Sequence, residues 1–254
     1  APAMAGLALG CLIPLWSFFL FRKLAGVSAA DAAALAAHYG SVSAVTFAAV
    51  IAMLDLKGIH YEGYMPAILA LMEVPAIAIG ISLAAVSGVT MRTVSMGGGT
   101  AALSGPPSGL GAVAAQALSS KSIVLLVGGL LIGFISGPAG LTKVKPFFAD
   151  LFPGMLCLFL LELGRVAASR IGDFRKVGFR LAALALALPV AHATLGLAIG
   201  AAIGLSEGGA IVLATLAASA SYIAAPAAVQ LALPQANPGY YLTCSLVITF
   251  PFNL

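Results

Sequence analysis

Charge is what this sequence lacks most. Only 8% of its 254 residues are Asp, Glu, Lys or Arg, whereas the residues AVILMFWYC make up 61%. A soluble domain carries about 25% charged and about 45–50% apolar residues. The 12 basic and 8 acidic side chains are too few to solvate the surface of a soluble globule of this length. The composition therefore excludes a soluble enzyme and an intrinsically disordered chain, and it leaves a protein whose solvent is mostly lipid.

Cysteine and metal-site motifs are also scarce. The 3 cysteines, Cys11, Cys157 and Cys244, each lie inside an apolar run and lack CxxC-type spacing, so neither a disulfide nor a metal site is indicated. The sequence contains no HExxH metalloprotease motif and no GxxxxGK[ST] phosphate loop. We therefore expect neither an enzyme nor a resident cofactor. The net charge of +4 indicates basic loops at a membrane rather than a nucleic-acid partner.

What the chain has instead is eight long apolar runs. In lipid such runs must be helical, because every backbone group needs an internal partner. They cover about residues 2–21, 29–54, 63–87, 122–141, 147–164, 179–203, 207–233 and 238–254. Between the third and fourth runs, residues 88–120 are rich in Gly, Ser and Pro and are predicted to form a connecting loop.

The basic residues predict how these spans are oriented. Nine of the 12 Lys and Arg residues lie in or beside the loops at residues 22–28, 88–121 and 165–178. Only Lys57, Lys143 and Lys145 fall on the opposite side. Because cytoplasmic loops carry the excess of Lys and Arg, these three loops are predicted to be cytoplasmic. We expect a multi-pass protein of the bacterial inner membrane.

Two parts of the chain resemble each other. Residues 26–43 read GVSAADAAALAAHYGSVS and residues 204–221 read GLSEGGAIVLATLAASAS, with matching Gly and Ser positions at one offset of 178. Gly63-Tyr64 with Pro75 and Gly239-Tyr240 with Pro251 share a second spacing. An odd number of spans separates the two copies, so they insert in opposite orientations, as in many secondary transporters. The pattern predicts an inverted five-plus-five helix repeat.

The repeat also divides the chain into three parts. Residues 1–87 form the first inverted repeat, which lacks about two N-terminal helices. Residues 88–120 are the cytoplasmic connection, and residues 121–254 form the second repeat. We therefore expect an all-α membrane protein with about eight of ten spans present in this chain, and with trimmed termini.

Polar residues gather at the centres of two related spans. Inverted-repeat transporters bind substrate where two helices break near the midplane and expose N–H groups and helix dipoles. The candidate substrate-binding residues are Gly40, Ser41, Ser43 and Thr46 in one span and Ser219, Ala220, Ser221 and Tyr222 in the other. Alternatively, the hydroxyls bond only to their own helices or allow close helix packing.

Glu73 is the one carboxylate predicted well inside a span, beside Pro75. A carboxylate at such a depth costs roughly 2.5–3.5 kcal/mol on insertion scales. We interpret Glu73 as a ligand for a coupling cation, with Ser43 and Ser221 as the other candidate sodium ligands. A proton-coupled carboxylate and a residue at the end of a shorter span are the alternatives. His38 and His192 are either pathway residues or core histidines.

At these residues the sequence resembles the sodium-dependent bicarbonate transporters typified by the cyanobacterial high-affinity system. The matching segments are GSVSAVT at 40–46, the region from Tyr61 to Ala76 containing MEVPA, SASYIAAPAA at 219–228 and LPQANPGYY at 233–241. The family pattern has an aspartate where this chain has Tyr222, and small or polar residues where it has Ala224 and Ala225. By these criteria the chain resembles a distant member of that family.

The resemblance implies ten helices in two inverted repeats, crossed broken helices and a homotrimer. It assigns Ser41, Ser43, Thr46, Ser219 and Ser221 to the substrate segments, and it matches Glu73 to an acidic residue followed by x-Pro. It also implies a PII-like regulator acting from the cytoplasm. The expected function is sodium-coupled uptake of bicarbonate by alternating access. The alternatives are a sodium-coupled transporter of another small or organic anion and a transport-inactive membrane receptor or scaffold.

Overall fold

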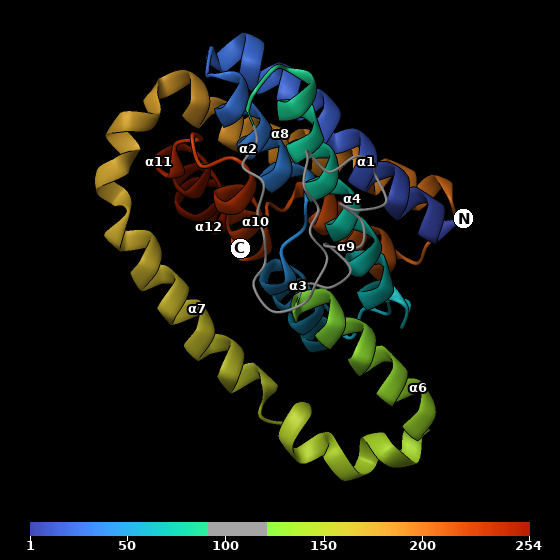
Figure 1. The fold of residues 1–254 in the computed structure, drawn as a ribbon. Helices are drawn as coiled ribbons and strands as arrows, with labels where there is room; N and C mark the ends of the chain where they lie inside the picture. The colour runs from blue at the N-terminus through green and yellow to red at the C-terminus, as the bar shows by residue number, and fades with distance from the viewer. Residues whose placement is uncertain (91–120) are drawn as a thin grey trace, which may run out of the picture.

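A computed structural model describes residues 1–90 and 121–254 of the chain. This part is built from helices and contains no strand (Figure 1). The fold class is therefore all-α, as the composition predicts. Apart from residues 88–90, the predicted connection at 88–120 lies outside the described residues.

Four helices form the first half of the fold. They are α1 (Pro2–Leu20), α2 (Ala29–Gly40), α3 (Ala44–Lys57) and α4 (Met65–Val86). α1 begins with Pro2 at its first position, where the missing N–H costs nothing, and it continues into a π-helical segment, η1 (Phe21–Ala25). Gly26 ends that segment with a φ of 71°, a left-handed conformation that favours glycine.

The second half contains three longer helices and six shorter elements. They are α6 (Lys121–Phe148), α7 (Phe152–Ser169), the 3₁₀ turn η2 (Ile171–Asp173), α8 (Phe174–Ala202), α9 (Glu207–Ala218), α10 (Ala224–Ala232), α11 (Pro238–Leu242), the π-helix η3 (Thr243–Thr249) and α12 (Phe250–Phe252). Non-helical backbone at Gly137 and Gly178 bends α6 and α8.

Six segments of the described chain are long and apolar enough to cross a membrane, against eight predicted. They are Pro2–Ala25, Ala29–Lys57, Met65–Val86, Val127–Phe148, Phe152–Ser169 and Val177–Ala202. The predicted span at 207–233 is divided into α9 and α10, which are 12 and 9 residues long. The predicted span at 238–254 is helical only from Pro238 to Phe252. Neither α9, nor α10, nor the run from Pro238 to Phe252 reaches the length of about 20 residues that a span needs.

The bundle packs through small side chains. A Cβ built on Gly80 of α4 would lie 2.6 Å from the Cα of Ala37 in α2, and one built on Gly10 of α1 would lie 2.9 Å from the Met72 carbonyl oxygen in α4. In the second half, a Cβ built on Gly196 of α8 would lie 2.8 Å from the Cα of Ala214 in α9. Because lipid gives no hydrophobic drive between helices, such close contact supplies much of the attraction.

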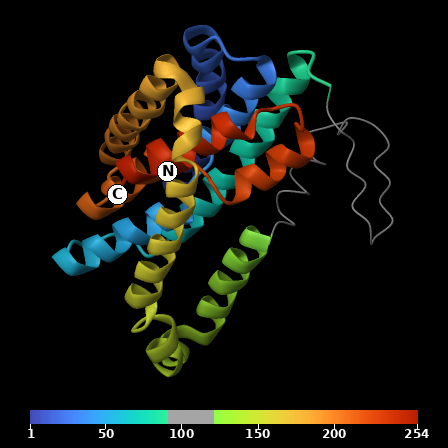
Figure 2. The same cartoon turned by 90° about the vertical axis from the view of Figure 1, so that its left-hand side faces the viewer.

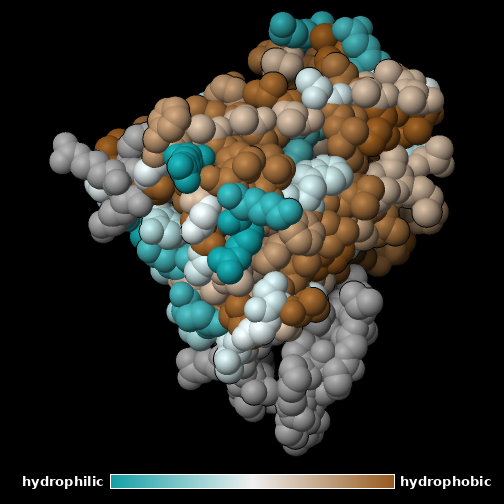
Figure 3. All heavy atoms as spheres, turned by 90° about the horizontal axis from the view of Figure 1, so that it is seen from above, coloured by the Kyte–Doolittle hydropathy of each residue, from teal (hydrophilic) through white to brown (hydrophobic). Residues whose placement is uncertain are grey.

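Helices α6 and α7 stand apart from this bundle. Figures 1 and 2 both show them as two arms that meet at the far end from α2 and α8. The spanning part of α6 has none of its residues buried, and that of α7 has 6%. Their exposed side chains are mostly apolar, and brown residues also cover much of the surface seen from above in Figure 3.

The boundaries of these two helices differ from the prediction. Spans at 122–141 and 147–164 were expected, but α6 continues to Phe148 and α7 begins only at Phe152. The reason is Gly137: it turns the backbone (φ 58°, ψ −167°), and Pro138 then starts a second helical stretch within α6. That stretch uses residues that the prediction placed in the loop.

Loops predicted to share one side of the membrane contact each other. On the side predicted to be cytoplasmic, the Gln235 amide donates to the Thr90 carbonyl (2.8 Å), and the Asn237 N–H donates to Asp31 Oδ1 (2.7 Å). At the other end, the Ser206 N–H donates to Glu62 Oε1 (2.7 Å). The start of α2 therefore contacts a loop of the second half of the chain, and the start of α9 contacts a loop of the first half. The two contacts lie on sides of the membrane that are predicted to be opposite.

Candidate functional site

Two helices break in the middle of the bundle. Between α2 and α3 the chain is extended at Ser41 (φ −84°, ψ 163°), and between α9 and α10 it is extended at Ser219 (φ −75°, ψ 161°). These are the two positions that the repeat relates and that the sequence predicts as polar centres. A glycine is needed next to the first break, since a Cβ on Gly40 would lie 2.7 Å from the ring of Pro14 in α1.

The two breaks are hydrogen-bonded to each other. The Ser43 N–H donates to Ser219 Oγ at 2.9 Å, and the Ser221 N–H donates to the His38 carbonyl at 2.8 Å. Ser219 Oγ in turn donates to the Leu216 carbonyl at 2.8 Å. The structure therefore brings the predicted substrate residues of both halves into one place.

A cluster of hydroxyls surrounds the start of α3. Ser43 Oγ accepts from the Thr46 N–H (3.1 Å) and from Thr46 Oγ1 (2.9 Å), and it donates to the Tyr222 hydroxyl (3.0 Å). A serine hydroxyl has one proton and two lone pairs. Ser43 Oγ thus has no lone pair left for a cation in this conformation. The Tyr222 hydroxyl accepts a bond, which leaves its own proton for another acceptor.

Other donors at the breaks are free. Ser41 Oγ is buried and has no hydrogen-bond partner within the described part of the chain. Ser221 Oγ accepts the N–H of Ala225 at 3.1 Å, a bond that does not use its own proton. The first turns of α3 and α10 also begin here, and such turns present N–H groups with no partner in their own helix. Positive helix ends and neutral donors together form a setting that favours an anion.

The predicted site residues are buried, but two residues beside them are exposed. Ser41, Ser43, Thr46, Ser219, Ala220 and Ser221 are at most 3% exposed. In contrast, Ala44 is exposed and Ile223 is 52% exposed. Val45 and Tyr222 belong to an apolar cluster that also contains Ala167 of α7. Helix α7 therefore packs beside the two breaks.

Glu73 is buried in α4, at 8% exposure. Within the described residues no hydrogen bond or ion pair joins it to Ser43, to Ser221 or to any basic side chain. The prediction that a carboxylate lies inside the protein is confirmed. Its assignment as a sodium ligand stays a prediction, because the hydrogen-bond pattern does not link it to the breaks.

The sequence missed two groups of residues that hold the breaks in place. The Tyr39 hydroxyl lies 2.6 Å from Thr249 Oγ1, which donates to the Ala185 carbonyl at 2.7 Å. Tyr39 therefore donates to Thr249, and the chain of bonds ties α2 to η3 and α8. The Asn253 amide donates to the Ala218 carbonyl at the end of α9 (3.0 Å). The position of Thr249 opposite Glu73 in the repeat was the only signal for these contacts.

The segment Gly204–Gly208, GLSEG, has the GxSxG pattern of a hydrolase nucleophile. Here the serine has a different role. Ser206 Oγ accepts the N–H of Gly209 at 3.0 Å and caps α9, as Ser28 Oγ caps α2 by accepting from Asp31. No strand precedes it in the described chain, whereas a nucleophile elbow joins a strand to a helix. The pattern is a helix cap.

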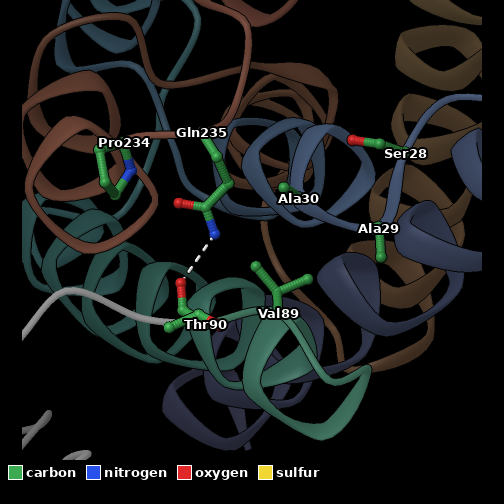
Figure 4. A pocket seen from close by; sticks show the side chains of 7 residues that line it. All are labelled: Ser28, Ala29, Ala30, Val89, Thr90, Pro234 and Gln235. Carbon is green, nitrogen blue, oxygen red and sulfur yellow. Dashed lines mark hydrogen bonds between the residues drawn. The ribbon is translucent and has the colours of Figure 1, made fainter.

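A cavity of about 800 Å³ in the described part of the structure does not lie at the breaks. Figure 4 shows it between the start of α2, the end of α4 and the loop after α10, with Gln235 pointing toward Thr90. Its walls, which include Ser28, Val89 and Pro234, contain none of the predicted site residues. Its position marks the end of the bundle where three loops meet.

A comparison with known protein families gives a match over residues 1–254, to the Na⁺-dependent bicarbonate transporter superfamily. The chain belongs to this superfamily. No curated protein matches the sequence. Since it belongs to this superfamily and has six apolar spans within residues 1–90 and 121–254, the chain is a multi-pass membrane protein of a transporter family. The family resemblance read from the sequence is confirmed.

Proposed function

We propose that this protein is a secondary transporter that couples the uptake of bicarbonate to sodium. The observation that carries the proposal is the pair of hydrogen-bonded breaks, Ser41–Ser43 and Ser219–Ile223, in a chain of this superfamily. Helices that break near the membrane midplane are where such transporters hold their substrates.

The anion would bind through neutral donors. Ser41 Oγ has no partner, and the hydroxyl protons of Ser221 and Tyr222 are not engaged by the bonds that these oxygens accept. A bicarbonate oxygen could accept from them and from N–H groups in the first turns of α3 and α10. Ser43, Thr46 and Ser219 would position these donors, since their own bonds hold the two breaks together.

Sodium needs oxygen ligands with free lone pairs. Glu73 supplies a buried carboxylate that has no described cation beside it, and a bound sodium would offset the cost of that buried charge. Ser221 Oγ accepts one bond and keeps a second lone pair. Ser43 would contribute only after its bonds from Thr46 break. We therefore place the coupling ion with Glu73 and Ser221 first.

The inverted repeat is supported by matched details. Gly26 and Gly204 have φ of 71° and 77°, and the serines two residues later, Ser28 and Ser206, both cap the following helix. The start of α2 is bonded to the loop at Asn237, and the start of α9 is bonded to the loop at Glu62. Two copies of one motif inserted in opposite directions provide the symmetry for alternating access, in which one bundle rocks against the other. The five-plus-five arrangement, with repeats at 1–87 and 121–254, follows from this proposal.

Helices α6 and α7 would then form part of a second bundle, against which the bundle of the breaks moves. Their apolar faces are exposed in the single chain and offer a surface for the trimer contacts that the family resemblance implies. The family resemblance likewise implies a PII-like regulator that acts from the cytoplasmic side.

A second anion is favoured by one observation. Tyr222 brings a neutral hydroxyl to the place where the family pattern has an aspartate. A hydroxyl donates to an anion more readily than a carboxylate does, and its larger ring changes the volume of the site. A different small anion or an organic carboxylate is therefore the alternative substrate.

Binding to the purified protein tests the proposal. We expect bicarbonate to raise the melting temperature in sodium chloride but much less in choline chloride, because ligands stabilise the state that binds them. Ser41→Ala should weaken the response, whereas Ser87→Ala, at the end of α4, should leave it unchanged. A response to formate or acetate that exceeds the response to bicarbonate would favour the alternative substrate. No response to any of these anions would contradict the proposal.

A further inference from the structure

A groove between α1 and α8 is separate from the breaks. It has a volume of about 510 Å³ and is lined by Trp16, Leu20, Leu188, Ala191, His192, Thr194 and Leu195. In its lining the Trp16 indole N–H donates to His192 Nε2 at 2.9 Å. The walls nearer to the helix ends, Leu20 and Leu188, are apolar, so the groove suits a hydrocarbon chain.

Basic side chains lie at one end of the groove. Lys23 follows Leu20 by about one turn, and Arg180 precedes Leu188 by eight residues on the same face of α8. Both side chains are exposed. The two helix ends are adjacent, because Phe21 of η1 packs in one core cluster with Val177 and Leu181 of α8. Two positive charges therefore flank this end of the groove, on the side that is predicted to be cytoplasmic.

The depth of the groove matches one leaflet. Arg180 and His192 are twelve residues apart, which is about 18 Å along a helix. Half of a bilayer core of about 30 Å is about 15 Å. An acyl chain that reached from the basic end to the Trp16–His192 pair would therefore span its leaflet, with its headgroup beside Lys23 and Arg180.

We infer that this groove binds an anionic phospholipid, whose phosphate contacts Lys23 and Arg180 and whose acyl chain lies along Trp16, Leu20 and Leu188. Charge complementarity selects the anionic headgroup, since basic pockets between spanning helices recognise such lipids. A basic residue near the membrane surface favours an anionic lipid by about fivefold. The site is distinct from the breaks, so it would set the stability of the α1–α8 pair rather than contact the anion.

The chain provides its own probe, because Trp16 is the only tryptophan. Bromine on an acyl chain quenches tryptophan fluorescence on contact. The wild-type protein is reconstituted in phosphatidylcholine and titrated with phosphatidylglycerol that carries brominated chains, and separately with brominated phosphatidylcholine. We expect saturable quenching at a severalfold lower fraction of brominated phosphatidylglycerol than of brominated phosphatidylcholine.

Three variants make the test specific. Lys23→Gln with Arg180→Gln, both at exposed positions, should abolish the preference for phosphatidylglycerol. Ala191→Phe should fill the groove and lower the quenching by both lipids. Lys57→Gln, at the other end of the bundle, should behave as wild type. Equal quenching by the two lipids in the wild type would show only the general lipid layer and would overturn the inference. An unchanged preference in the double variant, or no quenching at all, would overturn it as well.

Discussion

Removing the Ser219 hydroxyl tests whether the two breaks support each other. Ser219 Oγ accepts the Ser43 N–H at 2.9 Å and donates to the Leu216 carbonyl at 2.8 Å, and both serines are at most 3% exposed. In Ser219→Ala the Ser43 N–H is left buried without its acceptor. An unsatisfied buried group costs about 1–3 kcal/mol. For a chain of this size, each kcal/mol lowers the melting temperature by about 2–4 °C.

The matched control is Ser245→Ala. Ser245 is 0% exposed, but its hydroxyl donates only to the Tyr241 carbonyl, four residues earlier in the helical run. Its loss leaves no buried N–H without an acceptor, so the cost should stay below about 1 kcal/mol. Thermal unfolding of both variants in detergent gives the comparison. If Ser219→Ala loses no more stability than Ser245→Ala, the bond between the breaks does not hold them together.

Three further outcomes are expected. In Gly80→Leu the new side chain meets the Ala37 backbone, because even a Cβ at residue 80 would lie 2.6 Å from the Ala37 Cα. The free energy of unfolding in detergent should therefore fall by about 1–3 kcal/mol or more. Gly128→Leu on α6, with open space around it, is the control, and equal losses of stability would refute the close packing. Burial raises the pKa of the Glu62 carboxyl, but hydrogen bonds from Ser206 outweigh it and hold that pKa below its usual value. Its stabilising effect is therefore present above the usual carboxyl pKa and lost as the pH falls through the lowered value; Glu62→Gln should remove this acid-dependent loss in pH-resolved melting curves, and an identical pH profile would count against it. Tyr222→Phe removes a donor to a charged ligand and should weaken bicarbonate binding about tenfold or more in calorimetric titrations, with unchanged affinity as the contrary result.

The sequence predicted the parts of the fold that depend on local composition. The apolar runs located the main helices, because lipid requires helical backbone wherever the chain is apolar. The two polar centres were predicted because polar hydroxyls and a flexible glycine are unfavourable in the middle of an apolar helix, and their presence there indicates a function. The serine caps at Ser28 and Ser206 lie at matching positions of the repeat that the sequence predicts.

What the sequence could not predict depends on contacts between distant segments. The bond from Ser43 to Ser219 joins residues 176 apart, and the bond from Tyr39 to Thr249 joins residues 210 apart. Serine, threonine and tyrosine hydroxyls can bond to many groups, so the sequence alone does not identify their partners. The extension of α6 to Phe148 depends on how Gly137 turns the backbone, a choice that glycine leaves open. The separate position of α6 and α7 is likewise a matter of packing that their apolar composition does not encode.

The most direct test of the central proposal is uptake of labelled bicarbonate into proteoliposomes. An inward sodium gradient is imposed, and choline replaces sodium in the control. The account predicts sodium-dependent accumulation that saturates with bicarbonate and that Ser41→Ala or Ser221→Ala strongly reduces. Uptake that is the same with and without the sodium gradient, or that both variants leave at the wild-type rate, would contradict it.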